Sequence, residues 1–241
     1  MAKNQRQTRP IQGSLNRIHA MGKTILTSQQ SHFLELVSQE HQITKNFYLT
    51  GGTALAEFYY QHRYSEDIDL FTEQAEVDPK LPEALLKRFA PKLGIANWQR
   101  SQMLGLFSFL LMYNNGSKLK VDFNYYPFPR IEKGLEFKGL QVDSIHDMAA
   151  NKLHTIFMKP RARDYVDLYF ILKHEDFELK KLIIDAKTKF DWHIDKTTLA
   201  SQLLRAKEFP EEYQMLVPFS KKEMGNFYVD LAQSLKKDIF R

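Results

Sequence analysis

Two aspartates that lie one residue apart, Asp67 and Asp69, are candidates to bind metal ions. The run "DIDLF" alternates acidic and apolar residues, as a half-buried β-strand does. Alternate residues of a strand point to the same face, so both carboxylates should point the same way. Two negative charges this close are unfavourable unless a cation lies between them, and oxygen ligands select hard ions such as Mg²⁺. The simpler alternative is an acidic pair at a strand end that is merely solvated.

A third aspartate, Asp122, lies in the run "KLKVDFNY", which predicts a second strand. Its alternation places Leu119 and Val121 on one face and Asp122 on the other, together with Lys118 and Lys120. Asp122 is therefore either an ordinary exposed carboxylate or a third ligand from a neighbouring strand. Three aspartates on adjacent strands can hold two metal ions about 3.5–4 Å apart for in-line phosphoryl chemistry.

The turn Gly51-Gly52-Thr53 is a candidate phosphate site. The apolar run "NFYLT" predicts a strand that turns sharply into a helix over residues 53–62. Glycine lets an anion approach the backbone at a helix start, where the helix dipole favours negative charge, so a triphosphate would suit this place. Many glycine-rich turns serve packing alone, and the motif by itself is a weak signal.

Charged residues also gather near the start of a predicted helix, "RDYVDLYFILKH". Asp164 and Asp167 lie three residues apart and share one helix face, where they could simply cap and solvate the helix start. A basic group nearby could hold phosphates or could lie on the surface. Its members are Lys152, Lys159, Arg161 and Arg163.

The remaining pattern predicts an α/β part followed by helices. Strands flank the turn "NNGS", which predicts a hairpin, and helical periodicity replaces strand patterns after Ser144. No flexible linker separates the two parts, so we expect them to pack together with a cleft between. The expected division is a basic N-terminal arm (residues 1–28), an α/β domain (29–143) and a helical domain (144–241) that completes the cleft.

Composition excludes some classes of site. None of the 241 residues is cysteine, which rules out disulfides and thiolate metal sites. No apolar run has the length of a membrane span, and the first residues do not resemble a secretory signal peptide. We therefore expect a cytoplasmic protein without a membrane partner. The net charge is +5, and no acidic residue precedes Glu35. The basic arm is either a solvated tail or a segment that contacts phosphate backbones.

The order of these motifs resembles the nucleotidyltransferase superfamily that includes DNA polymerase beta. Within it, "GGTALAEFYYQHRYSEDIDLF" is similar to the AbiEii/AbiGii toxin family of abortive-infection systems. That family shows a Gly-Gly-Thr/Ser turn, a helix, and a run His-Arg-x-Ser-x-Asp-Ile-Asp-Leu-Phe, which residues 62–71 match. It also carries a lysine on a helix and an Arg-Asp-x-x-Asp-Leu helix, which Lys152 and residues 163–168 match. The resemblance spans about residues 47–172.

The resemblance implies an α/β (α+β) fold: a polymerase-beta-like domain with a mixed sheet, followed by a C-terminal helical bundle. It implies a Mg²⁺-dependent nucleotidyltransferase that moves a nucleotide from a nucleoside triphosphate to a tRNA 3′ end or a protein hydroxyl. Members of the family are often toxins that are paired with a separately encoded antitoxin.

The resemblance also assigns roles to residues. Asp67 and Asp69 would bind two Mg²⁺ ions, and Asp122 would bind the one that activates the acceptor hydroxyl. Lys152 would neutralise charge on the leaving pyrophosphate, and Asp164 would lie at the edge of the active site. The residues expected to bind the nucleotide are Gly51, Gly52, Thr53, Arg63, Ser65 and Lys152.

Two other functions fit the same residues. A metal-dependent nuclease also uses clustered carboxylates, but it needs no cradle for a triphosphate. A nucleotide-binding or antitoxin-binding module without activity is the non-enzymatic alternative. Loss of one of the three aspartates would indicate such a module, and all three are present.

Overall fold

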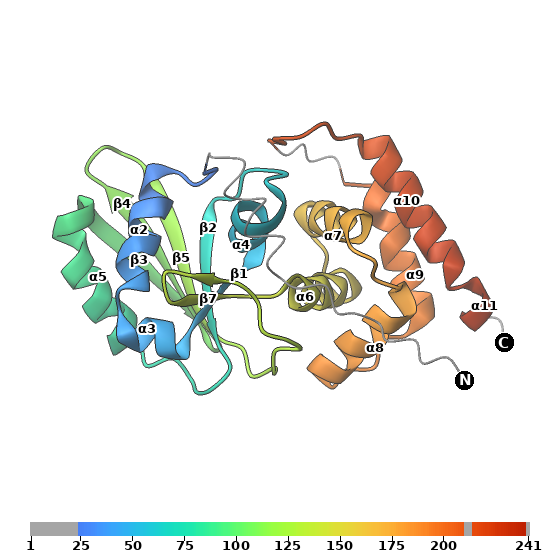
Figure 1. Ribbon diagram of the computed structural model, residues 1–241, viewed down its shortest axis with the longest axis horizontal. Coiled ribbons are helices and arrows are strands. Elements are labelled where there is room, and N and C mark those ends of the chain that lie inside the picture. Colours follow the sequence, from blue (N-terminus) through green and yellow to red (C-terminus); the bar gives the residue numbers. More distant parts are fainter. Residues whose placement is uncertain (1–23, 210–213, 240–241) are drawn as a thin grey trace, which may run out of the picture.

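The computed structural model describes residues 24–209 and 214–239, in which one mixed sheet is flanked by helices (Figure 1). Its strands run in the order β3-β4-β5-β2-β1-β7-β6. Their bounds are β1 Tyr48–Thr50, β2 Asp67–Thr72, β3 Ile95–Met103, β4 Leu106–Tyr113, β5 Lys118–Tyr125, β6 Glu136–Phe137 and β7 Leu140–Val142.

The register at the centre of the sheet positions the acidic residues. Strands β2 and β5 are parallel, and Asp69 lies opposite Asp122 while Asp67 lies opposite Lys120. Strand β1 is antiparallel to β2 and places Thr50 opposite Asp69. Because residues in register across a sheet point to the same face, the three aspartates and Thr50 share one surface.

The opposite face of the sheet is covered by α2 (Ser28–Ser38), α3 (His41–Asn46) and α5 (Lys80–Leu93), as Figure 1 shows. Apolar side chains fill this layer, and the rings of Phe33 and Phe89 meet edge to face with centroids 6.1 Å apart. This packing gives one face of the sheet to the core and leaves the aspartate face for the site.

Two elements differ from expectation. Strand β3 was not expected, because it is an edge strand that is mostly exposed and so lacks an apolar alternation. The helix expected over residues 53–62 begins earlier, as α4 (Gly51–Leu55), and continues as a π-helical segment over Ala56–Tyr60. It ends at Gln61, whose φ of 47° is left-handed. Short π-helical turns are frequent at functional sites.

The predicted C-terminal helices are confirmed. Their bounds are α6 Ile145–Met158, α7 Ala162–His174, α8 Leu179–Phe190, α9 Lys196–Leu204, α10 Lys221–Ser234 and α11 Lys236–Ile239, with a short 3₁₀ segment over Arg205–Lys207.

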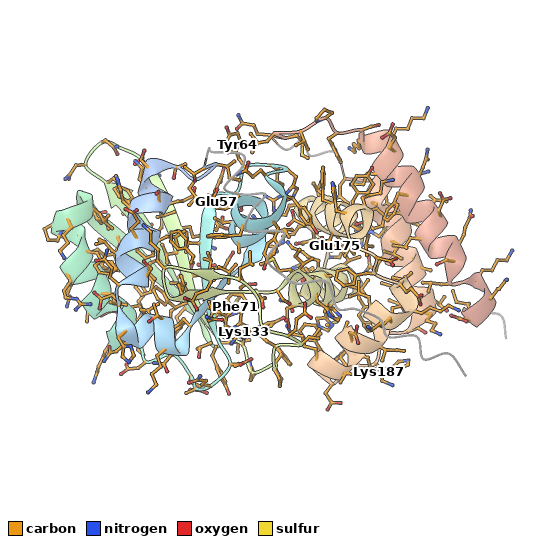
Figure 2. All side chains as sticks on the ribbon, viewed as in Figure 1. Glu57, Tyr64, Phe71, Lys133, Glu175 and Lys187 are labelled. Carbon is orange, nitrogen blue, oxygen red and sulfur yellow. The ribbon has the colours of Figure 1, made fainter. Side chains whose placement is uncertain are left out.

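Side chains pack throughout the space between the helices and the sheet (Figure 2). The buried Tyr228, for example, donates a hydrogen bond to the carbonyl of Tyr165 at 2.7 Å. No helix in the described ranges is long and apolar enough to cross a membrane. The division at residues 28 and 143 stays a prediction, and most of the basic arm lies outside the described residues.

Candidate active site

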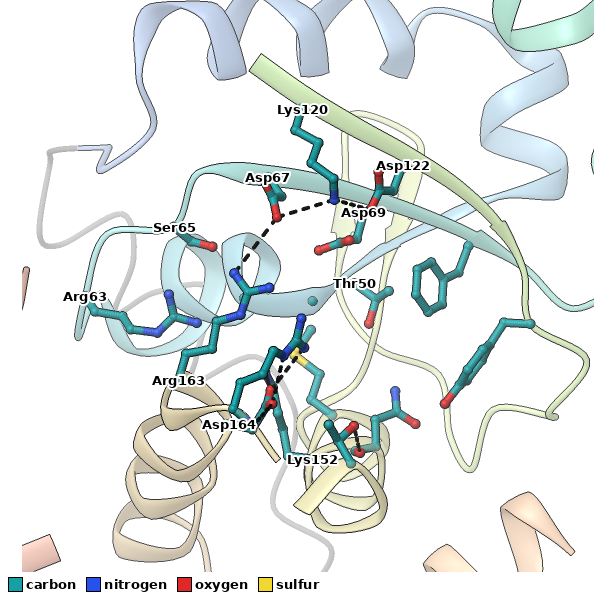
Figure 3. Close-up of a pocket in the computed structure, with 18 residues that line it drawn as sticks. Thr50, Arg63, Ser65, Asp67, Asp69, Lys120, Asp122, Lys152, Arg163 and Asp164 are labelled. Atoms are coloured by element: carbon teal, nitrogen blue, oxygen red, sulfur yellow. Dashed lines mark hydrogen bonds and ion pairs between the residues drawn. The ribbon is translucent and has the colours of Figure 1, made fainter. Parts of the chain in front are cut away.

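A cavity of about 230 Å³ lies between the aspartate face of the sheet and helices α6 and α7 (Figure 3). Its lining contains most of the residues singled out from the sequence. They are Gly51, Gly52, Arg63, Ser65, Asp67, Asp69, Asp122, Lys152, Arg161, Arg163 and Asp164, joined by Thr50, Phe71, Lys120, Tyr126, Met148, Asn151 and Thr155.

Asp69 lies at the centre of the negative charge. Burial, together with the charges of Asp122 and Asp67, raises its pKa to about 6. Its Oδ2 atom fits so closely against Gly51 that a Cβ there would lie 2.0 Å away, and Gly51 has a φ of +79°. Both constraints demand glycine at position 51, so the turn and the carboxylate form one unit.

The Lys120 ammonium lies beside the other two carboxylates. Its Nζ atom is 2.5 Å from Oδ2 of Asp122 and 3.6 Å from Oδ2 of Asp67. Burial lowers the pKa of Lys120, but the hydrogen bond and charge of Asp122 outweigh burial and leave the pKa raised. In the described part of the chain, no group of three or more His, Asp or Glu side chains is arranged to hold a metal ion. Lys120 and Arg163, whose Nη1 atom is 3.9 Å from Asp67, both place positive charge beside the aspartates.

Asp167 anchors a buried charge network behind the cavity. Its carboxylate accepts from Arg63 Nε at 2.7 Å and Nη2 at 2.8 Å, and from His62 Nε2 at 2.9 Å. Lys152 Nζ lies 2.6 Å from Oδ2 of Asp167, the oxygen that also accepts from Arg63 Nη2. Burial raises the pKa of Asp167, but the charges of Arg63 and Lys152 and these hydrogen bonds dominate, so it is held well below its usual range.

Asp164 holds the start of α7 to α6. Lys152 Nζ donates to its Oδ1 at 2.8 Å, and the backbone N–H of Arg161 donates to its Oδ2 at 3.1 Å. Lys152 therefore lines the cavity while two carboxylates, Asp164 and Asp167, bind its ammonium. Arg161 and Arg163 are more exposed than Lys152 and present positive charge at the cavity edge.

Thr53 does not line the cavity, in contrast to its expected role in binding the nucleotide. It is buried, and its hydroxyl donates to the backbone oxygen of Asp67. Thr53 thereby fixes α4 to β2 and positions Gly52. A Cβ at Gly52 would lie 2.6 Å from Arg63 Nη2 and 2.8 Å from Ser65 Oγ, so this glycine also packs against the protein itself.

Sequence reasoning missed Lys120 as part of the site and missed one whole end of the cavity. That end is formed by Thr50, Phe71, Tyr126, Met148, Asn151 and Thr155. A signal was present on α6, because residues 148, 151, 152 and 155 follow the spacing of one helix face. Lys152 could therefore have located the other three.

Comparison with known proteins gives the family. The family described as "Nucleotidyl transferase AbiEii toxin, Type IV TA system" matches residues 35–233. The chain belongs to the AbiEii family of nucleotidyltransferase toxins. The match extends beyond residues 47–172 on both sides and includes most of the C-terminal helices of this AbiEii protein.

Individual proteins are also similar to the chain. The uncharacterised protein aq_aa25 of Aquifex aeolicus (strain VF5) is 29% identical over 182 residues, which are 73% of this chain and 82% of the relative. The structure of JHP933 from Helicobacter pylori has a TM-score of 0.55 at 19% identity and covers 89% of this chain and 94% of its own.

A second Helicobacter pylori structure, described as a candidate nucleotidyltransferase, has a TM-score of 0.58 at 19% identity, with 89% and 97% covered. The two structures share the fold of this AbiEii protein, and the predicted polymerase-beta-like nucleotidyltransferase fold is confirmed.

A buried carboxyl beneath the cavity, Asp143, predicts how stability depends on pH. Burial raises its pKa to about 7. The native protein then holds a proton that the unfolded chain, with a pKa of about 3.9, has lost. Proton linkage therefore lowers the free energy of unfolding as pH rises from about 4 to about 7.

We expect Asp143→Asn to flatten that decline, with a gain over wild type of on the order of 2 kcal/mol at pH 8 relative to pH 5. Urea unfolding at both pH values measures it. Asp176→Asn, at an exposed position, is the matched control and should follow the wild-type curve. Parallel curves for Asp143→Asn and wild type would contradict a raised pKa.

Proposed function

We propose that this AbiEii protein transfers a nucleotide from a nucleoside triphosphate to a hydroxyl group of an acceptor, with pyrophosphate as the other product. The observation that supports this proposal most is the register of the sheet. It places Asp67, Asp69 and Asp122 on one face beside the Gly51-Gly52 turn, in a cavity that also contains Arg161 and Arg163. Carboxylates for cations and cationic groups for phosphates therefore lie in one cavity.

The donor atoms are of the type that Mg²⁺ prefers, although the three side chains are not arranged to hold an ion while Lys120 lies beside Asp67 and Asp122. Asp67, Asp69 and Asp122 offer only oxygen ligands, and burial together with the charges of Asp122 and Asp67 raises the pKa of Asp69. We propose that these three residues hold the ions, with Lys120 displaced from Asp122 when they bind. Bound Mg²⁺ supplies stabilisation of charge on the entering and leaving oxygens of an in-line displacement.

The chain's own residues bind and orient the substrates. Ser65 Oγ and the backbone at Gly52 lie together and would bind the distal phosphates, and Arg163, whose Nη1 atom is 3.9 Å from Asp67, would add a cation at the same end of the cavity. The acceptor oxygen forms a bond to the α-phosphorus as the bond to the β-phosphate oxygen breaks. Asp122 would accept the proton that the hydroxyl releases.

The acceptor proposed is a tRNA 3′ end or a protein hydroxyl, and a separately encoded antitoxin is the proposed partner. One experiment tests transfer and acceptor together: purified protein, Mg²⁺ and each labelled nucleoside triphosphate in turn, with total tRNA or with a protein extract. Label that enters an acceptor and requires Mg²⁺ supports the proposal. Binding of nucleotide without any labelled product would favour a silent binding module.

The basic arm should matter for a nucleic-acid acceptor and not for the nucleotide. Five basic residues and no acidic ones precede residue 24, and each phosphate contact adds to the salt dependence of binding. We expect deletion of residues 1–23 to weaken tRNA binding and to flatten its dependence on salt, with nucleotide binding unchanged. Titration with tRNA at several salt concentrations measures this. Equal salt slopes with and without the arm would exclude it from RNA binding.

A further inference from the structure

Along β2 the cavity lining changes from Asp67 and Asp69 to Phe71, and the backbone of Tyr126 hydrogen-bonds to Thr72 at the same end of the strand, so the two ends of the cavity differ chemically. One end carries the charged residues, including Asp69, Arg163 and Lys152. The other end is formed by aromatic, aliphatic and neutral polar side chains, namely Thr50, Phe71, Tyr126, Met148, Asn151 and Thr155. A ligand that fits both ends has a charged part and a flat or apolar part.

The aromatic wall of the second end is firmly packed. The rings of Phe71 and Tyr126 have centroids 5.0 Å apart. Behind them, Tyr126 contacts Phe128 at 4.8 Å and Phe190 at 6.1 Å, both edge to face. The two rings are inclined by 48° to each other, so a planar base can stack on one of them with the other at its edge, at little entropic cost.

Helix α6 forms the facing wall through Met148, Asn151 and Thr155. The Thr155 hydroxyl donates to the backbone oxygen of Asn151 at 2.9 Å, so it serves the helix itself. The Asn151 amide is held loosely, because Nδ2 donates to Asp143 Oδ2 at 3.3 Å and Oδ1 has no hydrogen-bond partner among the described residues. Asp143 is fixed in turn by Thr50, whose hydroxyl donates to Oδ2 at 2.7 Å.

The unpartnered oxygen, Asn151 Oδ1, is itself buried beside the cavity wall, so the amide must turn before an N–H donor in the cavity can reach it. A buried polar atom without a partner is costly, and the broad χ2 torsion of asparagine lets the amide turn toward a ligand. An asparagine amide carries both an acceptor and donors, which is the combination that distinguishes base edges.

We propose that this end of the cavity binds the nucleobase, stacked on Tyr126 with Phe71 at its edge, and that Asn151 determines which base is selected. The inference rests on the proposed nucleotide transfer, since it places the triphosphate at the charged end. Asn151 Oδ1 accepts from an exocyclic amino group of the base. Uracil has no such group, so uridine triphosphate binds most weakly of the four.

The test compares binding of the four nucleoside triphosphates and of inorganic tripolyphosphate, which has no base. Calorimetry measures dissociation constants for wild type, Asn151→Ala, Tyr126→Leu and Ser65→Ala, after melting curves confirm that each variant is folded. In wild type, the dissociation constants of the weakest-binding and tightest-binding nucleotides differ by some ratio. Asn151→Ala should reduce that ratio by about tenfold. Tyr126→Leu should raise the dissociation constants of all four nucleotides by about tenfold and leave that of tripolyphosphate unchanged.

Ser65→Ala is the matched control at the charged end. It should weaken the four nucleotides and tripolyphosphate by the same factor. An unchanged base ratio in Asn151→Ala, or a wild-type preference for uridine triphosphate, overturns the base site even if transfer is observed. The protein could also bind nucleotides with a base preference that depends on Asn151 but transfer none of them. That result would support the base site and contradict the proposed nucleotide transfer. A wild-type protein that binds no nucleotide overturns both.

Discussion

Replacement of Asp69 by asparagine is expected to lower the rate of nucleotide transfer by roughly a thousandfold or more, with no loss of stability. The variant keeps the size of the side chain but removes one of three carboxylates proposed to hold Mg²⁺. Metal ions in such sites contribute several kcal/mol to the stabilisation of the transition state. Each 1.36 kcal/mol corresponds to a tenfold change in rate, so the expected loss is large.

Stability should be equal or higher in Asp69→Asn, because burial and the charges of Asp122 and Asp67 raise the pKa of Asp69 to about 6. Above that pH the ionised carboxylate costs stability, and the neutral amide removes the cost. Nucleotide incorporation and thermal melting, with and without Mg²⁺, measure both effects. Asp191→Asn, at an exposed position, is the matched control. Transfer at near the wild-type rate would contradict the proposed metal site.

The sequence predicted the acidic residues because strands impose a local pattern. Alternation in "DIDLF" and "KLKVDFNY" was enough to predict on which face of its strand each of Asp69 and Asp122 lies. The parallel pairing of β2 with β5, which brings them into register, joins segments more than fifty residues apart. No local pattern contains that pairing, and the family resemblance supplied only the expectation that Asp122 joins the other two aspartates at one site.

Pairing of charges was the part that local patterns could not give. Arg63 and Lys152 were expected to bind phosphates, yet both contact Asp167, which is remote from Arg63 in sequence. Lys120 was placed on the correct face without a role. Its contact with Asp122 lies within one strand and was open to local reasoning, whereas its contact with Asp67 crosses between strands. The polar edge strand β3 gave no signal, since exposure on an edge removes the alternation that indicates a strand.

Asp167→Ala is expected to show the opposite behaviour to Asp69→Asn. Removal of this carboxylate leaves the buried guanidinium of Arg63 without its bidentate partner and deprives Lys152 and His62 of a contact. Breaking a buried ion pair from one side typically costs about 3–5 kcal/mol. For a chain of this length, that corresponds to a melting temperature lower by roughly 10 °C or more.

Urea unfolding measures the loss, and Asp185→Ala is the matched control. Asp185 pairs with His146 at 2.8 Å but is 22% exposed, so its removal should cost about 1 kcal/mol or less. If Asp167→Ala lowers the free energy of unfolding by less than about 1 kcal/mol, the charge network around Asp167 does not stabilise the fold as expected.

A double variant distinguishes the loss of the Arg63–Asp167 ion pair from the cost of removing Asp167 while Arg63 stays charged. In Arg63→Met with Asp167→Leu both partners become apolar, and Lys152 keeps its contact with Asp164. Apolar replacement of a buried pair is often neutral, whereas one unpaired partner is not. The double variant should therefore be more stable than Asp167→Ala. Its transfer activity then reports what the Arg63 guanidinium contributes at the cavity, apart from its ion pair with Asp167 on α7.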